Sequence, residues 1–165
     1  MSTSITIDIK KKIFKDFNKI NPDHVAIKDF YLKIPKGEFC SIVGPSGCGK
    51  TTLLNIVSGI DKSVEGTINF EKNRRIEDIK LAYMFQTPRL LPWLNVLENV
   101  EIILNKEQKK NKRAEEILQI MGLENFLLYY PQKLSGGMQR RVALARSFAS
   151  KPELFILDEP FISLD

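Results

Sequence analysis

The chain has 165 residues, of which 43% are hydrophobic and 27% are charged, and its formal net charge is +5. These values are typical of one ordinary globular domain and exclude a disordered or fibrous chain. No apolar run approaches the roughly 18 residues of a membrane span, and the N-terminus lacks the apolar core of a secretory signal. We therefore expect a cytoplasmic protein.

The cysteines and the lysine-rich runs exclude further classes. Cys40 and Cys48 have neither the spacing of a zinc site nor that of a disulfide framework. The positive charge comes largely from KKK at residues 10–12 and KKNKR at residues 109–113. No aromatic residues are interleaved with these charges, so the runs favour a solvated surface over nucleic-acid contact. A weak attraction to anionic lipid headgroups stays open.

The first 70 residues carry strand patterns. SITIDI and VAIKDFYLKI alternate apolar and polar side chains, and GTINF follows a turn signal at Gly66. EFCSIVG, at residues 38–44, is a compact apolar run into glycine, which predicts a strand buried on both faces.

Helical periodicity begins near Asn95. We predict a third helix after Ser135 that stops at Pro152, followed by a second buried strand, LFIL. The order of elements predicts an α/β core with an inserted helical region. The two earlier helices are indicated by apolar residues three and four apart: Val96, Leu97, Val100, Ile103 and Leu104, and then Ala114, Ile117, Leu118 and Met121 before Gly122.

Residues 44–51 read GPSGCGKT, a full match to GxxxxGK(S/T) between a predicted strand and a predicted helix, KTTLLNIVSG. The glycines let successive N–H groups point inward over a positive helix end, which suits the β-phosphate of a nucleotide. Lys50 is then expected to reach the β- and γ-phosphates, and the Thr51 hydroxyl to bind Mg²⁺. The predicted ATP-binding residues here are Gly44, Pro45, Ser46, Gly47, Cys48, Gly49, Lys50, Thr51 and Thr52.

The terminal LFILDEP delivers an acidic pair at the end of an apolar strand. Asp158 is placed to hold Mg²⁺, and Glu159 to orient or deprotonate an attacking water. The alternative interpretation is a strand followed by an acidic turn without a catalytic role, and the presence of the phosphate loop argues against it. LSGG at residues 134–137 then puts Ser135, Gly136 and Gly137 at a helix N-terminus, a second candidate anion site.

With LSGGMQRRVALARS at residues 134–147, the sequence resembles the ATP-binding subunit of an ABC transporter, whose signature is LSGGQ or LSGGMQ. Four motifs agree in order: the phosphate loop, Gln86 after a strand in LAYMFQ, the signature, and LFILDEP. The resemblance implies a phosphate-loop NTPase (RecA-like) core with an N-terminal antiparallel β region and an inserted helical subdomain at about residues 88–148. It implies one ATP-binding domain over residues 1–165, with the C-terminal part of the core missing.

The resemblance also implies roles for single residues. Glu159 and Gln86 are catalytic, and Thr51, Gln86 and Asp158 bind Mg²⁺. Phe17 stacks on adenine, with Phe14 as the alternative, and an ordinary core role is open for either. Two subunits pack head to tail, with Asp165 contacting the second subunit. The signature residues act on the other subunit's ATP; they are Leu134, Ser135, Gly136, Gly137, Met138 and Gln139.

Partners and cargo follow from the same resemblance. It implies a peripheral protein on the cytoplasmic face of the membrane, powering membrane-spanning permease subunits and, indirectly, a solute-binding protein. Leu90, Leu91 and Trp93 either receive a helix of the permease or pack in the helical region. The sequence of residues 87–100, TPRLLPWLNVLENV, is similar to that of importers of nitrate, sulfonates, taurine or thiamine-precursor pyrimidines.

One departure concerns the end of the chain. The family's switch histidine lies on a strand beyond Asp165 that normally inserts between the phosphate-loop strand and the LFIL strand. We expect this chain alone to be poorly stable and weak or inactive in hydrolysis, although its phosphate loop is able to bind nucleotide. The alternatives are a non-hydrolysing nucleotide-binding remnant and a soluble ABC ATPase without a transport role.

Overall fold

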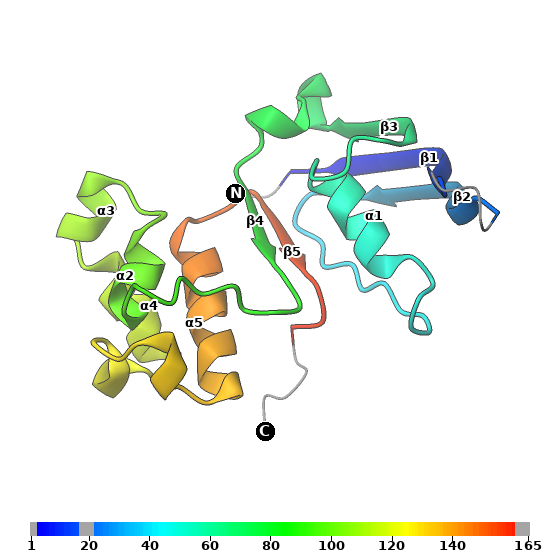
Figure 1. Cartoon of the computed structure of the whole chain (residues 1–165). Coiled ribbons are helices and arrows are strands. Elements are labelled where there is room, and N and C mark those ends of the chain that lie inside the picture. Colours follow the sequence, from blue (N-terminus) through cyan, green and yellow to red (C-terminus); the bar gives the residue numbers. More distant parts are fainter. Residues whose placement is uncertain (1–2, 17–21, 161–165) are drawn as a thin grey trace. The chain divides into compact units, whose positions relative to one another are not determined.

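The structure, a computed structural model, describes residues 3–16 and 22–160 of the chain (Figure 1). The predicted sites at Phe17 and Asp165 lie outside these residues. The chain forms two compact units, Met1–Leu81 and Ala82–Asp165. Within the described ranges, no helix combines the length and apolarity needed to cross a bilayer.

The first unit contains a three-stranded antiparallel sheet in which β1 (Ile5–Phe14) lies between β2 (His24–Ile34) and β3 (Glu65–Phe70) (Figure 1). Ile5, Ile7 and Ile9 on β1 are almost fully buried. Their alternation puts all three on one face, and burying each contributes roughly 1.5–3 kcal/mol. The three predicted strands are confirmed.

Gly66 explains a local irregularity in this sheet. The pairing of β1 with β3 shifts register between Ile9 and Lys11, next to Gly66. A Cβ at Gly66 would clash with the backbone of Asp8 and Ile9. A glycine is therefore needed where the two backbones approach closely.

The predicted buried strand at residues 38–44 is wrong. These residues form no strand, and Phe39 and Val43 are 83% and 90% exposed. A strand buried on both faces needs hydrogen-bonded neighbours. Neither sheet within the described part of the chain includes this segment.

Helix α1 (Lys50–Val57) follows the phosphate loop, as predicted. Its apolar side chains Leu53, Ile56 and Val57 are buried, with the three-residue spacing of one helix face. Two short 3₁₀ turns, Glu71–Asn73 and Ile76–Asp78, follow β3.

The second unit is built around three helices, α2 (Val96–Glu101), α4 (Arg113–Ile120) and α5 (Gly136–Ala149). The predictions of α4 and α5 are confirmed. Buried apolar residues of these helices and their connections form one cluster: Val96, Val100, Leu104, Ala114, Ile117, Leu118, Leu123, Leu134, Val142, Ala145 and Ala149.

Two details of the helical region differ from the prediction. Helix α2 ends at Glu101, so Leu104 joins the core from the following turn, and Ile103 is 43% exposed. A short helix, α3 (Lys106–Lys110), precedes the lysine-rich run at residues 109–113 and includes its first two residues. Its start is fixed by a reciprocal capping box between Asn105 and Gln108.

Strands β4 (Leu81–Met84) and β5 (Leu154–Leu157) form a second sheet (Figure 1). The Phe155 ring on β5 stacks on Phe148 of α5 with a centroid distance of 4.6 Å. The predicted strand LFIL is confirmed, but its burial is only partial, since Ile156 is buried and the other three residues are half-buried. The two strands bring the segments that follow them, residues 85–86 and 158–159, to one end of the sheet.

Candidate functional site

The phosphate loop, residues 44–49, leads into α1 through Gly49, which has the left-handed value φ = 95°. A Cβ at this position would lie 2.9 Å from the carbonyl oxygen of Ala26 on β2. Glycine thus satisfies both the backbone conformation and the close approach to β2. The loop is exposed along residues 44–48, so its backbone faces solvent.

The Lys50 side chain folds back over this loop. Its ammonium donates hydrogen bonds to the carbonyl oxygens of Gly44 and Pro45, each at 2.8 Å, and lies 3.8 Å from the Cys48 sulfur. Neutral carbonyls are weaker acceptors for an ammonium than phosphate oxygens, because a phosphate also attracts the ammonium through its negative charge. A phosphate entering the loop can therefore compete for this ammonium.

The first turn of α1 fits an anionic ligand. No side chain caps its N-terminus, and no acidic residue lies in its first turn. The leading N–H groups of a helix lack partners within the helix and carry its positive dipole end. Thr51 is exposed and Thr52 half-buried in this turn. Ser46, Gly47 and the free thiol of Cys48 are exposed in the loop before it.

Gln86 and Glu159 meet at the end of the second sheet. The Gln86 side-chain amide donates a hydrogen bond to the Glu159 carboxylate. Asp158 is 5% exposed, and its backbone N–H donates to the carbonyl oxygen of Met84 at 2.9 Å. Glu159 itself has φ = 50°, a value that few residues other than glycine adopt. The buried Asp158 carboxylate therefore sits beside an amide–carboxylate pair on a strained turn.

Burial and charge also act on Tyr83, which lies on β4. Burial in the first place, and then the negative charge of Asp158, raise the pKa of the Tyr83 hydroxyl to about 12, against an opposing effect of Arg89. The hydroxyl is therefore neutral at physiological pH. It stays a hydrogen-bonding group and does not compete with the two carboxylates for cations.

Two arginines of α5 hold the segments that carry Gln86 and Glu159. The Arg140 guanidinium donates to the Glu159 carbonyl oxygen at 3.3 Å. Arg146 donates to the carbonyl oxygens of Pro88 and Arg89, at 3.0 and 3.2 Å. Neither arginine was predicted from the sequence to have this role. Arg146 could have been found as a charged residue within the buried, alanine-rich stretch of α5.

Asn99 binds the backbone of the C-terminal part of the loop that follows Gln86. This role was not predicted from the sequence. Asn99 is fully buried among the apolar residues of α2. Its side-chain oxygen accepts from the Leu91 N–H at 2.8 Å, and its amide donates to three carbonyls: Leu91, Leu94 and Asn95. A polar residue at an apolar helical position was the available signal.

Two of the apolar residues predicted either to receive a permease helix or to pack in the helical region, Leu90 and Trp93, differ in their burial. Leu90 packs against the helical core, whereas Trp93 is 69% exposed. The core-packing alternative thus holds for Leu90, and Trp93 presents a large apolar surface to solvent.

The signature segment begins α5. Leu134 is buried in the helical core, and Ser135 and Gly136 are exposed. The Ser135 hydroxyl accepts from the Met138 N–H at 3.2 Å and so caps the helix. The Gln139 amide donates to the Pro131 and Leu134 carbonyls, at 2.9 and 3.3 Å, which fixes the turn before the helix.

The structure brings Gln86, Asp158 and Glu159 together in the second unit. Lys50, Thr51 and the rest of the phosphate loop belong to the first unit. In the described ranges, no three His, Cys, Asp or Glu side chains gather as metal ligands. In the second unit, the Asp158 carboxylate and the side-chain oxygen of Gln86 are of the ligand types that Mg²⁺ binds.

The chain is similar in sequence to ATP-binding proteins of known transporters. The aliphatic sulfonates import ATP-binding protein SsuB of Bacillus subtilis is 39% identical over 164 residues, which are 98% of this chain and 63% of that protein. The bicarbonate transport ATP-binding protein CmpC of Synechocystis is 38% identical over 172 residues and is covered to 26%. The chain thus spans less than two thirds of the length of these relatives.

A solved structure extends the similarity to three dimensions. The ATP-binding cassette MJ0796, in a dimeric post-hydrolysis state bound to ADP and Pi, superposes with a TM-score of 0.85 at 35% identity. The match covers 98% of this chain and 76% of that one. The predicted phosphate-loop NTPase fold is thereby confirmed. Since the family description "ABC transporter" also matches residues 27–162, this chain belongs to the ABC transporter family of ATP-binding proteins.

Proposed function

We propose that this chain binds and hydrolyses ATP to energise solute import through membrane-spanning partner subunits. The observation that carries the proposal is the open phosphate loop. The Lys50 ammonium, in the first turn of the uncapped helix α1, donates to the neutral carbonyls of Gly44 and Pro45 and to the Cys48 sulfur. This arrangement offers the terminal phosphates a cation and a helix N-terminus that carries no side-chain cap.

Glu159 is the proposed general base, and Gln86 its companion. The carboxylate accepts the proton of an attacking water, and the Gln86 amide, already bonded to it, orders the water. Arg140 fixes the backbone of Glu159, so the carboxylate is positioned before ATP arrives. Cleavage of the γ-phosphate from ATP then depends on the position of the Glu159 carboxylate and on the stabilisation of negative phosphate charge by Lys50.

Mg²⁺ is proposed to be held by Thr51, Gln86 and Asp158. Oxygen ligands of this kind suit Mg²⁺, and the buried carboxylate of Asp158 supplies the negative charge. When bound, Mg²⁺ would neutralise charge on the β- and γ-phosphates.

The base of ATP needs an aromatic platform, and two phenylalanines are candidates. Phe17 is the sequence-based choice and lies outside the described residues. Phe14, the alternative, ends β1 with its side chain 46% exposed. The exposed ring, in the same unit as the phosphate loop, supports Phe14.

A head-to-tail dimer is proposed to complete the site. The signature residues, Leu134–Gln139, contact the γ-phosphate bound to the second subunit, and Asp165 contacts that subunit. The exposed Ser135 and Gly136 at the start of α5 support this role, and so does the dimeric state of the similar cassette MJ0796. Loss of the γ-phosphate would then release the dimer.

The proposed partners are permease subunits at the cytoplasmic face of the membrane, with a solute-binding protein acting indirectly. The exposed Trp93, on a loop whose backbone is bonded to α5, supports permease contact there. The proposed cargo is a small oxyanion such as nitrate, a sulfonate or taurine. The names of relatives that import aliphatic sulfonates or transport bicarbonate support this class.

Phosphate release from Mg-ATP tests the proposal. Turnover per chain should rise with protein concentration, because the signature acts in the second subunit. Glu159→Gln should lower turnover by about 100-fold or more while Mg-ATP binding persists. Glu107→Gln, on the exposed face of α3, is the matched control and should change neither. A chain that binds Mg-ATP but releases no phosphate at any concentration would contradict hydrolysis by this chain and favour the alternative of a non-hydrolysing nucleotide-binding remnant.

A further inference from the structure

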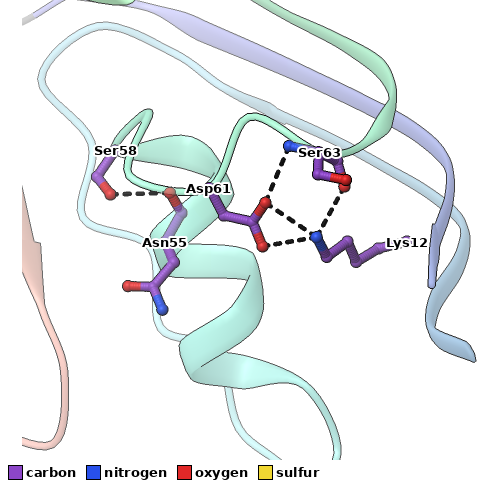
Figure 2. A network of polar contacts seen from close by, with 5 residues as sticks. All are labelled: Lys12, Asn55, Ser58, Asp61 and Ser63. Atoms are coloured by element: carbon purple, nitrogen blue, oxygen red, sulfur yellow. Dashed lines mark hydrogen bonds and ion pairs between the residues drawn. The ribbon is translucent and has the colours of Figure 1, made fainter. Parts of the chain in front are cut away.

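Lys12 is a buried lysine outside the site described above. It lies on β1, is 3% exposed, and belongs to the KKK run that was predicted to be a solvated surface. That prediction is wrong for Lys12. Its ammonium donates to the Asp61 carboxylate, with both oxygens within 2.9 Å, and to the Ser63 carbonyl at 2.7 Å (Figure 2).

These acceptors belong to the turn that leaves the phosphate-loop helix. Asp61 follows α1 by four residues, and its N–H donates to the Asn55 carbonyl inside the helix at 3.0 Å. The Ser63 N–H donates to the Asp61 carboxylate at 2.9 Å (Figure 2). Burial alone would raise the pKa of Asp61, but the bonds from Lys12 and Ser63 outweigh it and lower the pKa. Lys12 therefore anchors the C-terminal end of α1 through an ionised pair.

The same ammonium also lies over the ring of Phe14, 4.8 Å from its centroid. This distance is within the range of cation–π attraction. Phe14 is the last residue of β1 and pairs with His24 on β2, two residues before Ala26, whose carbonyl meets Gly49 of the phosphate loop. The exposed ring thus belongs to the same corner of the unit as the loop.

A buried ion pair is weak support for stability, because apolar residues of similar volume often serve as well. The ion pair instead fixes positions, because the Lys12 ammonium is bonded to Asp61 and Ser63 and lies over the Phe14 ring. Lys12 is the residue that contacts both Phe14 and the exit of α1.

We propose that Lys12 is a positioning residue for nucleotide binding, which fixes the spacing between the Phe14 ring and helix α1. The inference rests on the proposed ATP site and deepens it. The ring takes the adenine base, the N-terminal end of α1 takes the phosphates, and Lys12 holds the ring and the helix at a fixed separation through its contacts with both. A ligand with only the phosphate end does not depend on that separation.

Calorimetric titration of the full chain with Mg-ATP and with Mg-tripolyphosphate tests this role. Lys12→Met should weaken Mg-ATP binding about fivefold or more and Mg-tripolyphosphate binding less than twofold. Lys12→Arg keeps the charge over the ring and should restore most of the ATP affinity. Lys10→Met, at an exposed position of the same strand, is the control and should change neither.

The other outcomes separate the explanations. Equal losses for both ligands would mean that Lys12 only supports the fold, and no loss would remove it from binding; either result overturns the inference. If Lys12→Met does not fold, Asp61→Asn replaces it, with a two- to threefold loss expected for Mg-ATP alone, and unchanged ATP affinity again overturns the inference. A wild-type chain that binds neither ligand would instead contradict the proposed function.

Discussion

Helices α1 and α5 both begin at a glycine-rich segment, but they differ in whether a side chain caps the N-terminus. Gly49 leads into α1 without a side-chain cap, whereas the Ser135 hydroxyl caps α5 by accepting from the Met138 N–H. Helix α1 is eight residues long, and α5 has 14 residues whose buried side joins the core of the helical region. The N-terminus of α1, without a side-chain cap, is the proposed phosphate site, whereas the Ser135 hydroxyl already satisfies one N–H at the start of α5.

The two helices are also anchored by different chemistry. The exit of α1 is tied to β1 by the ionised pair of Lys12 and Asp61. Helix α5 is tied to its surroundings by arginines that donate to backbone carbonyls, through Arg140 and Arg146. An anchor between two charged side chains responds to acid, while an anchor from arginine to a carbonyl does not.

The largest expected effect is at the open helix end. Lys50→Ala removes the only side-chain cation bonded to the loop carbonyls within the described residues, and should lower ATP turnover by about 100-fold or more. Phosphate release measures this change. Lys36→Ala, an exposed lysine in the segment before the loop, should retain turnover. Turnover within threefold of wild type for Lys50→Ala would remove α1 as the phosphate site.

The next effect concerns the anchor of α5. Arg146→Ala leaves the carbonyls of Pro88 and Arg89 without their charged donor, and should lower the free energy of unfolding by about 2 kcal/mol. Urea titration followed by the fluorescence of Trp93, the single tryptophan, reports on the same loop. Lys133→Ala, exposed in the turn before α5, serves as control. An unchanged midpoint for Arg146→Ala would show that this anchor is dispensable.

A smaller effect is expected at the capped end. Ser135→Ala should lower the free energy of unfolding by about 1 kcal/mol, and Ser135→Thr should recover most of the loss, because threonine also caps. Ser46→Ala in the phosphate loop should have almost no effect on stability, since no side chain caps α1. Equal losses at both positions would remove the difference between the two helix ends.

The smallest effect is the response to acid. The pKa of Asp61 is lowered from 3.8, so its contribution to stability is complete above this value and is lost as the pH falls through the folded-state pKa. Wild type should therefore exceed Asp61→Asn in stability at pH 6, and the gap should narrow below about pH 4. Thermal unfolding over this range measures it. A gap that widens in acid would contradict the ion pair.

Local patterns predicted most elements because their causes are local. Alternation at Ile5, Ile7 and Ile9 marks β1, and the three- and four-residue spacing at Ala114, Ile117 and Leu118 marks α4. The run at residues 38–44 has the composition of a strand, yet composition cannot supply the hydrogen-bonded neighbour that a strand requires. Helix α3 was missed because its capping box lies in a lysine-rich segment without an apolar face.

The candidate site divides in the same way. The phosphate loop is contiguous and was readable from residues 44–51, Glu159 was predicted from the acidic pair after LFIL, and the resemblance supplied Gln86. Their hydrogen bond spans 73 residues, and no pattern indicates which acidic residue an amide that distant will contact. Arg140 and Arg146 were missed for a related reason, since a helix sequence does not specify which backbone carbonyls its arginines reach.

The sequence by itself determined the chemical groups of this protein: the loop that can bind phosphate, the signature at the start of α5, and the acidic pair after β5. Only the tertiary structure decided how these groups are held. It buried one lysine of three against an aspartate 49 residues away, and it placed two arginines on the carbonyls beside Gln86 and Glu159. Motifs are short-range because they are read along the chain. The contacts that position them are long-range, because packing brings distant segments together at hydrogen-bond distance.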